Sequence, residues 1–226
     1  RNATIETVEY SDGFGRLLQI RTQAEDVLFG DQHFGGGILS AEQSNSTGDA
    51  VGRRRAANGP MNVVVSGWQV YDNKGRVVEK YEPFFDRGYE YNPPSDAQLG
   101  QKAVMFYDPR GQVIRTLNPD GSEQRVVYGV PANLTDPEAF APTPWEAFTY
   151  DVNDLAPVTK APDGTSLANA APKSHHFTPS SVEIDALGRM VLSIARNRTV
   201  SDNPSDPLSP IQELRTQTAY DIRGNV

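Results

Sequence analysis

Aspartate side chains are the most regularly placed groups in this chain that could do chemistry. Residues 107–128 read YDPRGQVIRTLNPDGSEQRVVY, and each aspartate in this stretch is followed by a glycine within three residues. Carboxylates can bind metal ions or transfer protons. In this spacing they are also typical of hairpin turns, because the carboxylate accepts hydrogen bonds from backbone N–H groups and the glycine takes a positive φ. We interpret these aspartates as turn residues, since each has its own glycine.

The pattern recurs along the chain. A self-comparison aligns segments of the form D-x-x-G, followed by Arg, Gln or Asn and then an apolar residue, usually with an aromatic or aliphatic residue before the Asp. Repetition of this kind indicates a fold built from copies of one unit. The turn-forming positions that we predict are Asp12 and Gly15, Asp72 and Gly75, Asp108 and Gly111, Asp120 and Gly121, Asp185 and Gly188, and Asp221 and Gly224.

The three histidines give little sign of a metal site. His175 and His176 are adjacent, so on a strand they would point to opposite faces and make a poor chelate. His33 lies beside a glycine run that lacks the phosphate-binding pattern G-x-x-x-x-G-K-[ST]. The sequence therefore predicts neither a metal site nor a cofactor.

A second group of oxygen ligands lies at Asp151, Asn153 and Asp154. Alternating oxygen ligands begin a calcium loop, but this run lacks the glycine and the downstream glutamate that complete one. A structural role explains the same three residues equally well, with the acidic side chains capping turns at a corner anchored by Trp145. The chain also has no G-x-S-x-G motif, and we predict that it is not an enzyme.

The composition favours many short strands. The chain has 226 residues, with 37% hydrophobic residues, 19 glycines and 17 prolines, which leaves little room for long helices. The net charge of -8 argues against nucleic acid as a partner, and no apolar run is long enough to insert into a membrane. The absence of cysteine excludes disulfides and thiolate metal sites.

The predicted fold class is all-β, with antiparallel hairpins that form part of a curved sheet. Strands are expected at 103–107, 112–117 and 122–128, joined by turns at 108–111 and 118–121. Because the turn aspartates are unevenly spaced, we expect long loops or insertions near 30–60 and 129–180 in a fragment of repeating sheet that covers 1–226.

Aromatic residues gather in the central strands. They could form ring ladders between neighbouring strands, or an exposed row that binds sugars, and we favour the ladders. The residues concerned are Tyr71, Tyr81, Phe84, Phe85, Tyr89, Tyr91, Phe106, Tyr107 and Tyr128.

Several motifs together resemble a known family. YSDGFGR at 10–16, NKGR at 73–76 leading into YEPFF at 81–85, and DALGR at 185–189 are similar to the YD or Rhs repeats of bacterial toxins. With FYDP at 106–109, PDG at 119–121, and PW at 144–145 followed by DVND at 151–154, they resemble the B component (TcB, SpvB/TcdB-like) of ABC (Tc) insecticidal toxin complexes. The anchors follow the family order over almost the whole chain. The chain departs from the family at residues 66–68 and in the Ala- and Pro-rich segment 154–179. An Rhs or SpvB-like protein in which shell and toxin form a single chain is therefore an alternative to a shell divided between separate B and C components.

The resemblance implies a section of a hollow, cocoon-like shell of β-sheet that encloses a cytotoxic C-terminal domain. The implied partners are the rest of the same shell polypeptide, a TcC-like C component or C-terminal effector, and an A-component translocation channel contacted through other regions. It implies secretion to the extracellular space, after a cytoplasmic stage before release, and no catalytic residue of the family maps onto this region. A free-standing cell-surface adhesion or carbohydrate-binding module, with Trp68 or the tyrosines as its binding surface, is the alternative that we retain.

Overall fold

The computed structural model describes residues 4–25, 27–28, 53–54, 58–96, 98–169, 173–199 and 208–226. Its strands pair in antiparallel fashion, and helix is confined to short turns, which confirms the all-β prediction. The chain divides into two compact units, Arg1–Val104 and Met105–Val226. Most of the loop expected near 30–60, with His33 in it, lies outside the described residues.

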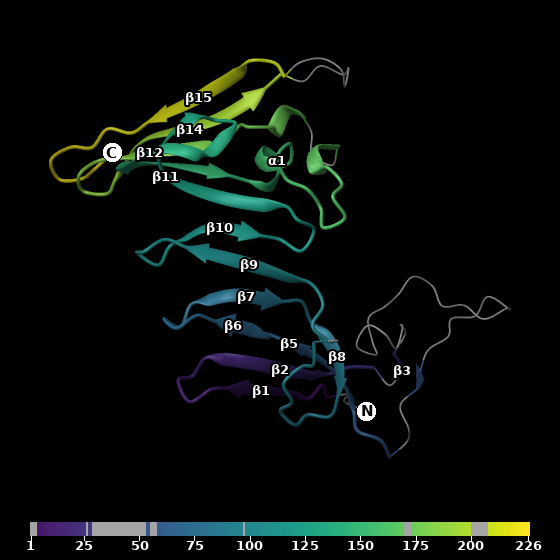
Figure 1. Cartoon of the computed structure of the whole chain (residues 1–226). Helices are drawn as coiled ribbons and strands as arrows, with labels where there is room; N and C mark the ends of the chain where they lie inside the picture. Colours follow the sequence, from purple (N-terminus) through teal and green to yellow (C-terminus); the bar gives the residue numbers. More distant parts are fainter. Residues whose placement is uncertain are drawn as a thin grey trace. The chain divides into compact units, whose positions relative to one another are not determined.

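Unit 1 contains a four-stranded sheet in the order β1-β2-β5-β8, together with a second set of strands (Figure 1). β6 and β7 form a hairpin, and β7 pairs with the first half of β9, while β3 pairs with β4. The bounds are β1 (Thr7–Ser11), β2 (Leu17–Gln23), β3 (Val27–Leu28), β4 (Arg53–Arg54), β5 (Asn62–Ser66), β6 (Gln69–Tyr71), β7 (Val77–Tyr81), β8 (Phe84–Arg87) and β9 (Lys102–Tyr107).

The core of unit 1 is small and partly polar. The β-branched residues Val63 and Val65 of β5 are buried against Phe84 of β8, with Trp68 packed on the same cluster. Beside this cluster the side chain of Arg21 on β2 is fully buried. Burial of an arginine requires partners for its N–H groups, which makes Arg21 the most demanding side chain of the unit.

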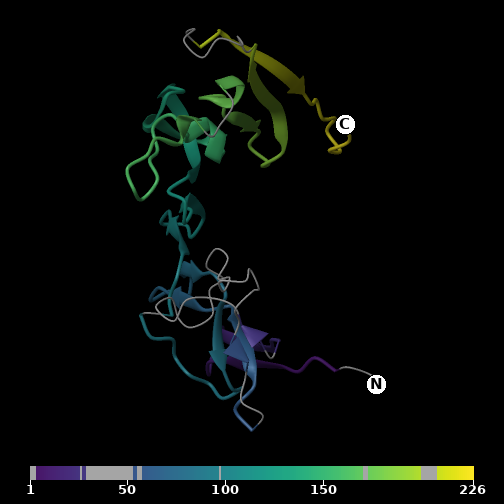
Figure 2. The same cartoon turned by 90° about the vertical axis from the view of Figure 1, so that its right-hand side faces the viewer.

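Unit 2 is a meander in which strands pair in chain order, from the second half of β9 to β15 (Figures 1 and 2). The strands expected at 103–107, 112–117 and 122–128 are confirmed, although the third continues five residues further than expected. The bounds are β10 (Val113–Leu117), β11 (Glu123–Asn133), β12 (Asp136–Tyr150), β13 (Ser180–Ile184), β14 (Met190–Arg198) and β15 (Ile211–Gln217).

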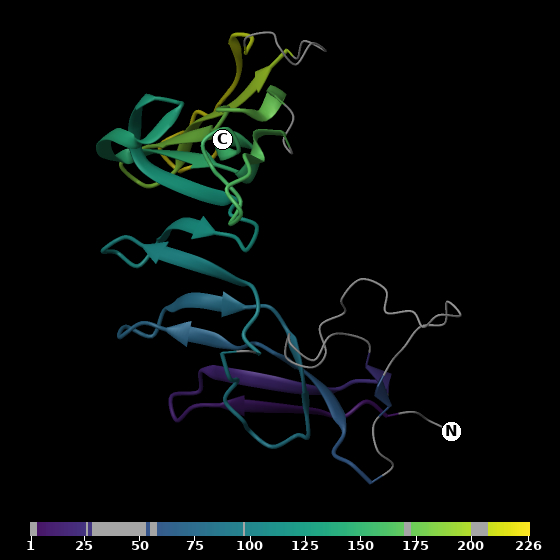
Figure 3. The same ribbon diagram turned by 45° about the vertical axis from the view of Figure 1, so that its right-hand side comes forward.

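Near 129–180 the sequence suggested long loops or insertions. The first part of this region contains the end of β11 and all of β12, seen in teal in Figure 3, so it is paired strand and not loop. Gly129 and three prolines of β12 hide the strand pattern, and the register jumps so that residues 143–146 bulge out between Tyr128↔Ala147 and Gly129↔Pro142.

The remainder of this region covers the sheet of unit 2. It contains the helix α1 (Val152–Leu155) and two 3₁₀ turns, η1 (Leu167–Asn169) and η2 (Lys173–His175). Leu155 of α1 is buried against Val127, Phe148 and Tyr150 of β11 and β12. This cluster is the core of unit 2, so the inserted segment supplies part of the hydrophobic core.

Candidate functional site: the repeated aspartate turns

One backbone geometry recurs at the predicted turns. At Asp185 the N–H donates to the carbonyl of Arg189 at 2.9 Å, and the N–H of Gly188 donates to the carbonyl of Asp185 at 2.9 Å. The same two hydrogen bonds occur in the turns that begin at Asp12, Asp72, Asp108 and Asp221. The fourth residue has a positive φ in every turn, between 76° and 88°, at Gly15, Gly75, Gly111, Gly121, Gly188 and Gly224.

The aspartate carboxylate accepts hydrogen bonds from groups of its own turn. Oδ1 of Asp185 accepts from the backbone N–H groups of Leu187 at 2.9 Å and Arg189 at 3.0 Å. Oδ2 lies 2.8 Å from Nε and 2.7 Å from Nη2 of Arg189, a two-pronged ion pair. Asp12 and Asp72 hold Arg16 and Arg76 in the same way.

In two turns the residue after the glycine is not arginine. Asn225 follows Gly224, and its side-chain amide donates to Asp221, whereas Gln112 follows Gly111 and the side chain of Arg110, inside the turn, donates to Asp108. With its acceptor sites used in this way, each carboxylate is poorly placed to hold a metal ion. No group of three or more potential metal ligands occurs in the described residues.

Asp120 occupies a different position within its turn from the other predicted aspartates. Its turn begins at Asn118, whose N–H donates to the carbonyl of Ser122 at 2.8 Å, while Gly121 donates back to Asn118 at 3.0 Å. Asp120 is therefore the third residue, and its Oδ1 accepts from the N–H of Ser122 at 2.9 Å and from its hydroxyl at 2.6 Å. Gly121 keeps the fourth position.

A contact between successive turns was missed by the sequence reasoning. The guanidinium of Arg189 lies 4.5 Å from the ring centroid of Tyr220, and the Tyr220 hydroxyl donates to the carbonyl of Met190 at 3.0 Å. Arg16 lies 4.8 Å from the ring of Tyr71, whose hydroxyl donates to the carbonyl of Leu17 at 3.0 Å. We call this arrangement the Arg–Tyr clasp. Its sequence signal is the tyrosine directly before the next turn aspartate.

Several aromatic rings contact guanidinium groups, whereas the sequence predicted ladders of rings. A ring pair exists between Tyr10 and Tyr91, with centroids 5.5 Å apart. Other rings face cations: Tyr128 faces Arg110 at 4.5 Å and Phe106 faces Arg115 at 5.3 Å. The reason is local, because the turns at Asp12, Asp108 and Asp185 each hold a guanidinium beside a neighbouring ring, and this geometry is attractive for a cation and a π system.

The group at 151–154 caps a helix. Oδ1 of Asp151 accepts from the N–H groups of Asn153 at 2.8 Å and Asp154 at 2.9 Å, and Oδ2 of Asp154 accepts from the N–H of Asp151 at 2.9 Å. This reciprocal pair is a capping box, so these carboxylates stabilise the first turn of α1 instead of forming a calcium loop. Burial raises the pKa of Asp154, whose Oδ1 also accepts from the N–H of Thr178 at 2.7 Å.

The histidines are not arranged as a chelate. His175 ends the turn η2, and the buried His176 follows it, so neither lies on a strand. The carbonyl of His175 accepts from the Thr178 hydroxyl, and that of His176 accepts from Arg198. These two residues contribute backbone acceptors to the packing of the inserted segment.

Solved structures share this fold. No protein-family model matches the chain, and no curated protein sequence matches it. The structure of TcdB2-TccC3 aligns over 97% of this chain with a TM-score of 0.63 and 24% identity. The Tc holotoxin pore of Photorhabdus luminescens aligns over 98% with a TM-score of 0.61 and 24% identity, and TcdB2-TccC3-Cdc42 over 97% with 0.62 and 23%. The chain has the fold of a segment of these Tc toxin structures.

The Tc-like fold is shared over a short stretch of much longer chains. The chain spans about 8% of the length of each of these three structures. At this identity the likeness establishes the fold. In the described part of the chain, none of the helices combines the length and apolar character needed to span a bilayer.

The turn carboxylates make stability depend on pH. Their pKa values are lowered, for Asp12 chiefly by the backbone N–H of Arg16 and for Asp185 chiefly by the Arg189 side chain. A carboxyl with a lowered folded-state pKa stabilises the fold above its unfolded pKa and loses this effect as pH falls through the folded value. We expect urea denaturation to give a falling free energy of unfolding from about pH 5 to about pH 2.

The Asp185→Asn variant is expected to show a shallower fall, because one of the contributing groups no longer titrates. Asp154 acts in the opposite direction, since its raised pKa favours the folded state at low pH. A free energy of unfolding that rises on acidification would show that carboxyls with raised pKa values, Asp154 and Glu146, outweigh the turn aspartates, and would contradict the prediction.

The clasp hydroxyl is expected to contribute measurably to stability. Tyr71→Phe keeps the ring over Arg16 but removes the hydrogen bond to Leu17, and we expect a loss of about 0.5–1.5 kcal/mol in the free energy of unfolding. Tyr91→Phe is the matched control, because the Tyr91 ring packs on Tyr10 and its hydroxyl makes no hydrogen bond within the described residues. Equal losses in the two variants would rule out a specific role for the clasp hydroxyl.

Proposed function

We propose that this chain is a structural section of an Rhs/YD-repeat shell that encloses a cytotoxic C-terminal domain for delivery into target cells. The observation that carries the proposal is the fold shared with TcdB2-TccC3 over 97% of this chain. The proposed role is mechanical, without catalysis, because the turn carboxylates are used within their own turns. The toxin would be held back by the wall itself.

The free strand edges suit a wall that continues beyond these residues. Among the strands that the structure describes, β15 has one hydrogen-bonded neighbour, β14, and nearly all of its side chains are exposed, including Leu214 at 66%. An open edge of this kind invites pairing with another strand. In the proposed shell these edges pair with the rest of the same polypeptide, while a TcC-like component or C-terminal effector supplies the toxin. An A-component channel would contact other regions of a secreted complex.

The native gene product tests this proposal. We expect a polypeptide several times longer than these 226 residues, whose toxic part resists protease at concentrations that digest it after denaturation. Its mass and its digestion pattern measure the two properties. A native product of this length alone could not close a shell, and a long product with an unprotected toxic part would equally reject the proposal.

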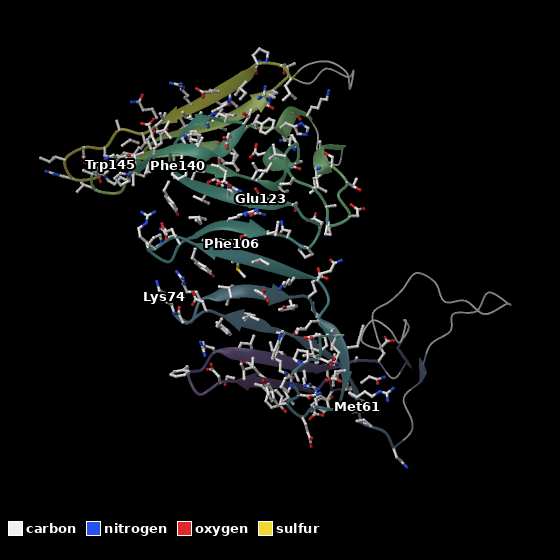
Figure 4. All side chains as sticks on the ribbon, in the orientation of Figure 1. Met61, Lys74, Phe106, Glu123, Phe140 and Trp145 are labelled. Atoms are coloured by element: carbon white, nitrogen blue, oxygen red, sulfur yellow. The ribbon has the colours of Figure 1, made fainter. Side chains whose placement is uncertain are left out.

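A sugar-binding module has one observation in its favour. Trp145 and Phe140 on β12 are 51% and 41% exposed and are both labelled in Figure 4. Against it, Trp68 packs on the core of unit 1, and Tyr71 and Tyr128 have guanidinium groups over their rings. A glycan array probed with the chain at high concentration should remain blank, whereas saturable binding lost in Trp145→Ala would favour the module.

A further inference from the structure

The strand β15 forms one edge of the sheet of unit 2. Among the strands that the structure describes, it pairs with β14 alone, in an unbroken ladder from Leu192↔Gln217 to Arg198↔Ile211. Figure 1 shows β15 in yellow at the end of the sheet. Every residue of β15 except Ile211 is exposed. The outer side of this strand is therefore a place where a further strand can pair.

Alternate residues of β15 direct their backbone groups to that outer side. The N–H of Thr218, just after the strand, donates to the carbonyl of Val191 at 3.0 Å. In an antiparallel ladder the residues that exchange hydrogen bonds with a given neighbour alternate along the strand. Gln212, Leu214 and Thr216 thus direct their backbone groups to β14. The outward N–H and C=O groups belong to Ile211, Glu213, Arg215 and Gln217.

These outward groups favour one register for an antiparallel second copy of β15. Outward-facing residues must meet outward-facing residues, so the two strands can shift past one another only in steps of two residues. With Leu214 opposite its own counterpart, Glu213 lies opposite Arg215 of the second copy, and the whole strand is paired. The two neighbouring registers place Glu213 opposite Glu213, or Arg215 opposite Arg215. Like charges directly opposite each other are destabilising, so the centred register is preferred.

The charged side chains on one face of β15 fit the centred register. Glu213 and Arg215 lie on the same face, with Oε2 of Glu213 2.6 Å from Nη2 of Arg215. Arg196 of β14 is opposite Glu213, and its Nε lies 3.2 Å from Oε1 of Glu213. A second copy extends this pair to a row of alternating charge, in which Glu213 lies between Arg196 and Arg215 of the second copy. Opposite charges on neighbouring strands stabilise a sheet.

The other face of β15 presents an exposed leucine at the centre of the strand. Leu214 is 66% exposed. In the centred register it meets Leu214 of the second copy as a pair without mutual hydrogen bonds, the arrangement in which cross-strand side chains come closest. This contact removes apolar surface of both leucines from water. The exposed leucine is thus matched by its own counterpart.

We propose that β15 binds β15 of a second copy of this chain, in antiparallel orientation about a two-fold axis at Leu214. The outward backbone groups, the charges of Glu213 and Arg215, and the central leucine are all self-complementary, as an interface between identical surfaces requires. The inference goes beyond the proposed shell function, because the second copy takes the place that the rest of a shell polypeptide would take at this edge.

Sedimentation velocity of the full chain between about 5 and 500 μM tests the inference, and we expect a reversible equilibrium between monomer and dimer. Arg215→Glu makes a carboxylate face Glu213 of the other copy, and Glu213→Arg makes two guanidinium groups face each other. Each variant alone should therefore dimerise at least about tenfold more weakly. An equimolar mixture of the two variants should regain the dimer, because each carboxylate of one chain then faces a guanidinium of the other.

Two further variants separate the interface from the fold. Leu214→Lys leaves the ion pairs of each copy intact but places two ammonium groups at the two-fold axis, so it should also weaken the dimer. Lys80→Glu is the control, since Lys80 is exposed on β7 and its reversal changes the net charge as much as Arg215→Glu does. The dimer should be unchanged in this control.

Several results would overturn the inference. A chain that stays monomeric up to about 500 μM would do so. Undiminished dimerisation of Arg215→Glu, Glu213→Arg or Leu214→Lys would place the contact at another surface or in another register. A mixture of the two charge-reversed variants that remains monomeric would contradict the pairing of Glu213 with Arg215. Assemblies that grow beyond a dimer would contradict the two-fold axis. None of these results bears on the mass or protease protection that tests the shell proposal.

Discussion

Arg21→Met is expected to lower the free energy of unfolding of unit 1 by about 3–5 kcal/mol, because it removes one partner of a buried ion pair. The guanidinium of Arg21 is fully buried and lies 2.9 Å from Asp86. It also donates to the carbonyl of Gly88 at 2.9 Å and to the side chain of Gln19 at 2.6 Å. Methionine fills similar space but leaves these acceptors without their donor.

The loss of stability should be largest in residues 88–92, whose carbonyls at Gly88 and Asn92 accept hydrogen bonds from Arg21. Hydrogen exchange of the amides at 88–92 should accelerate more than exchange in unit 2, and urea denaturation gives the free energy. Arg87→Met is the control, since Arg87 is exposed on β8 of the same sheet and surface charges contribute at most about 1 kcal/mol. If the two variants are equally stable, Arg21 is not the anchor that its contacts indicate.

Gly121→Ala is expected to have the second large effect. Gly121 has a φ of +86°, and a Cβ there would lie 2.3 Å from the carbonyl oxygen of Lys160 and 3.0 Å from Cα of Ala161. Alanine in this backbone region costs about 1–2 kcal/mol, and overpacking against the backbone adds about 1–3 kcal/mol more. The clash cannot be relieved by a side-chain rotation, because the obstructing atoms belong to the main chain.

The matched control is Gly15→Ala. Gly15 has a φ of +77° in the same kind of turn, but a Cβ there would meet no atom within 4 Å. We expect Gly15→Ala to cost only the backbone contribution, so the difference between the variants, measured by urea denaturation, isolates the packing of residues 160–161 on the turn. A difference near zero would mean that the segment moves away without cost.

Much of the fold was predictable because it is encoded locally. The Asp108 and Asp185 turns close through hydrogen bonds within five residues, and the strands on either side have apolar and β-branched residues. The same locality explains why the strands at 129–150 were not predicted, since Gly129 and the prolines of β12 obscure a strand whose pairing is set by β11.

The sequence by itself determined the turns, the all-β class and the absence of a recognisable catalytic motif, since these depend on residue types at short spacing. Only the tertiary structure decided that Arg16 meets Tyr71, that Arg21 is buried, and that the β10–β11 ladder stops after Arg115. The Tyr71 hydroxyl and its acceptor Leu17 are 54 positions apart. Such contacts depend on which strands become neighbours and on how far each ladder extends, and no short stretch of residues specifies either.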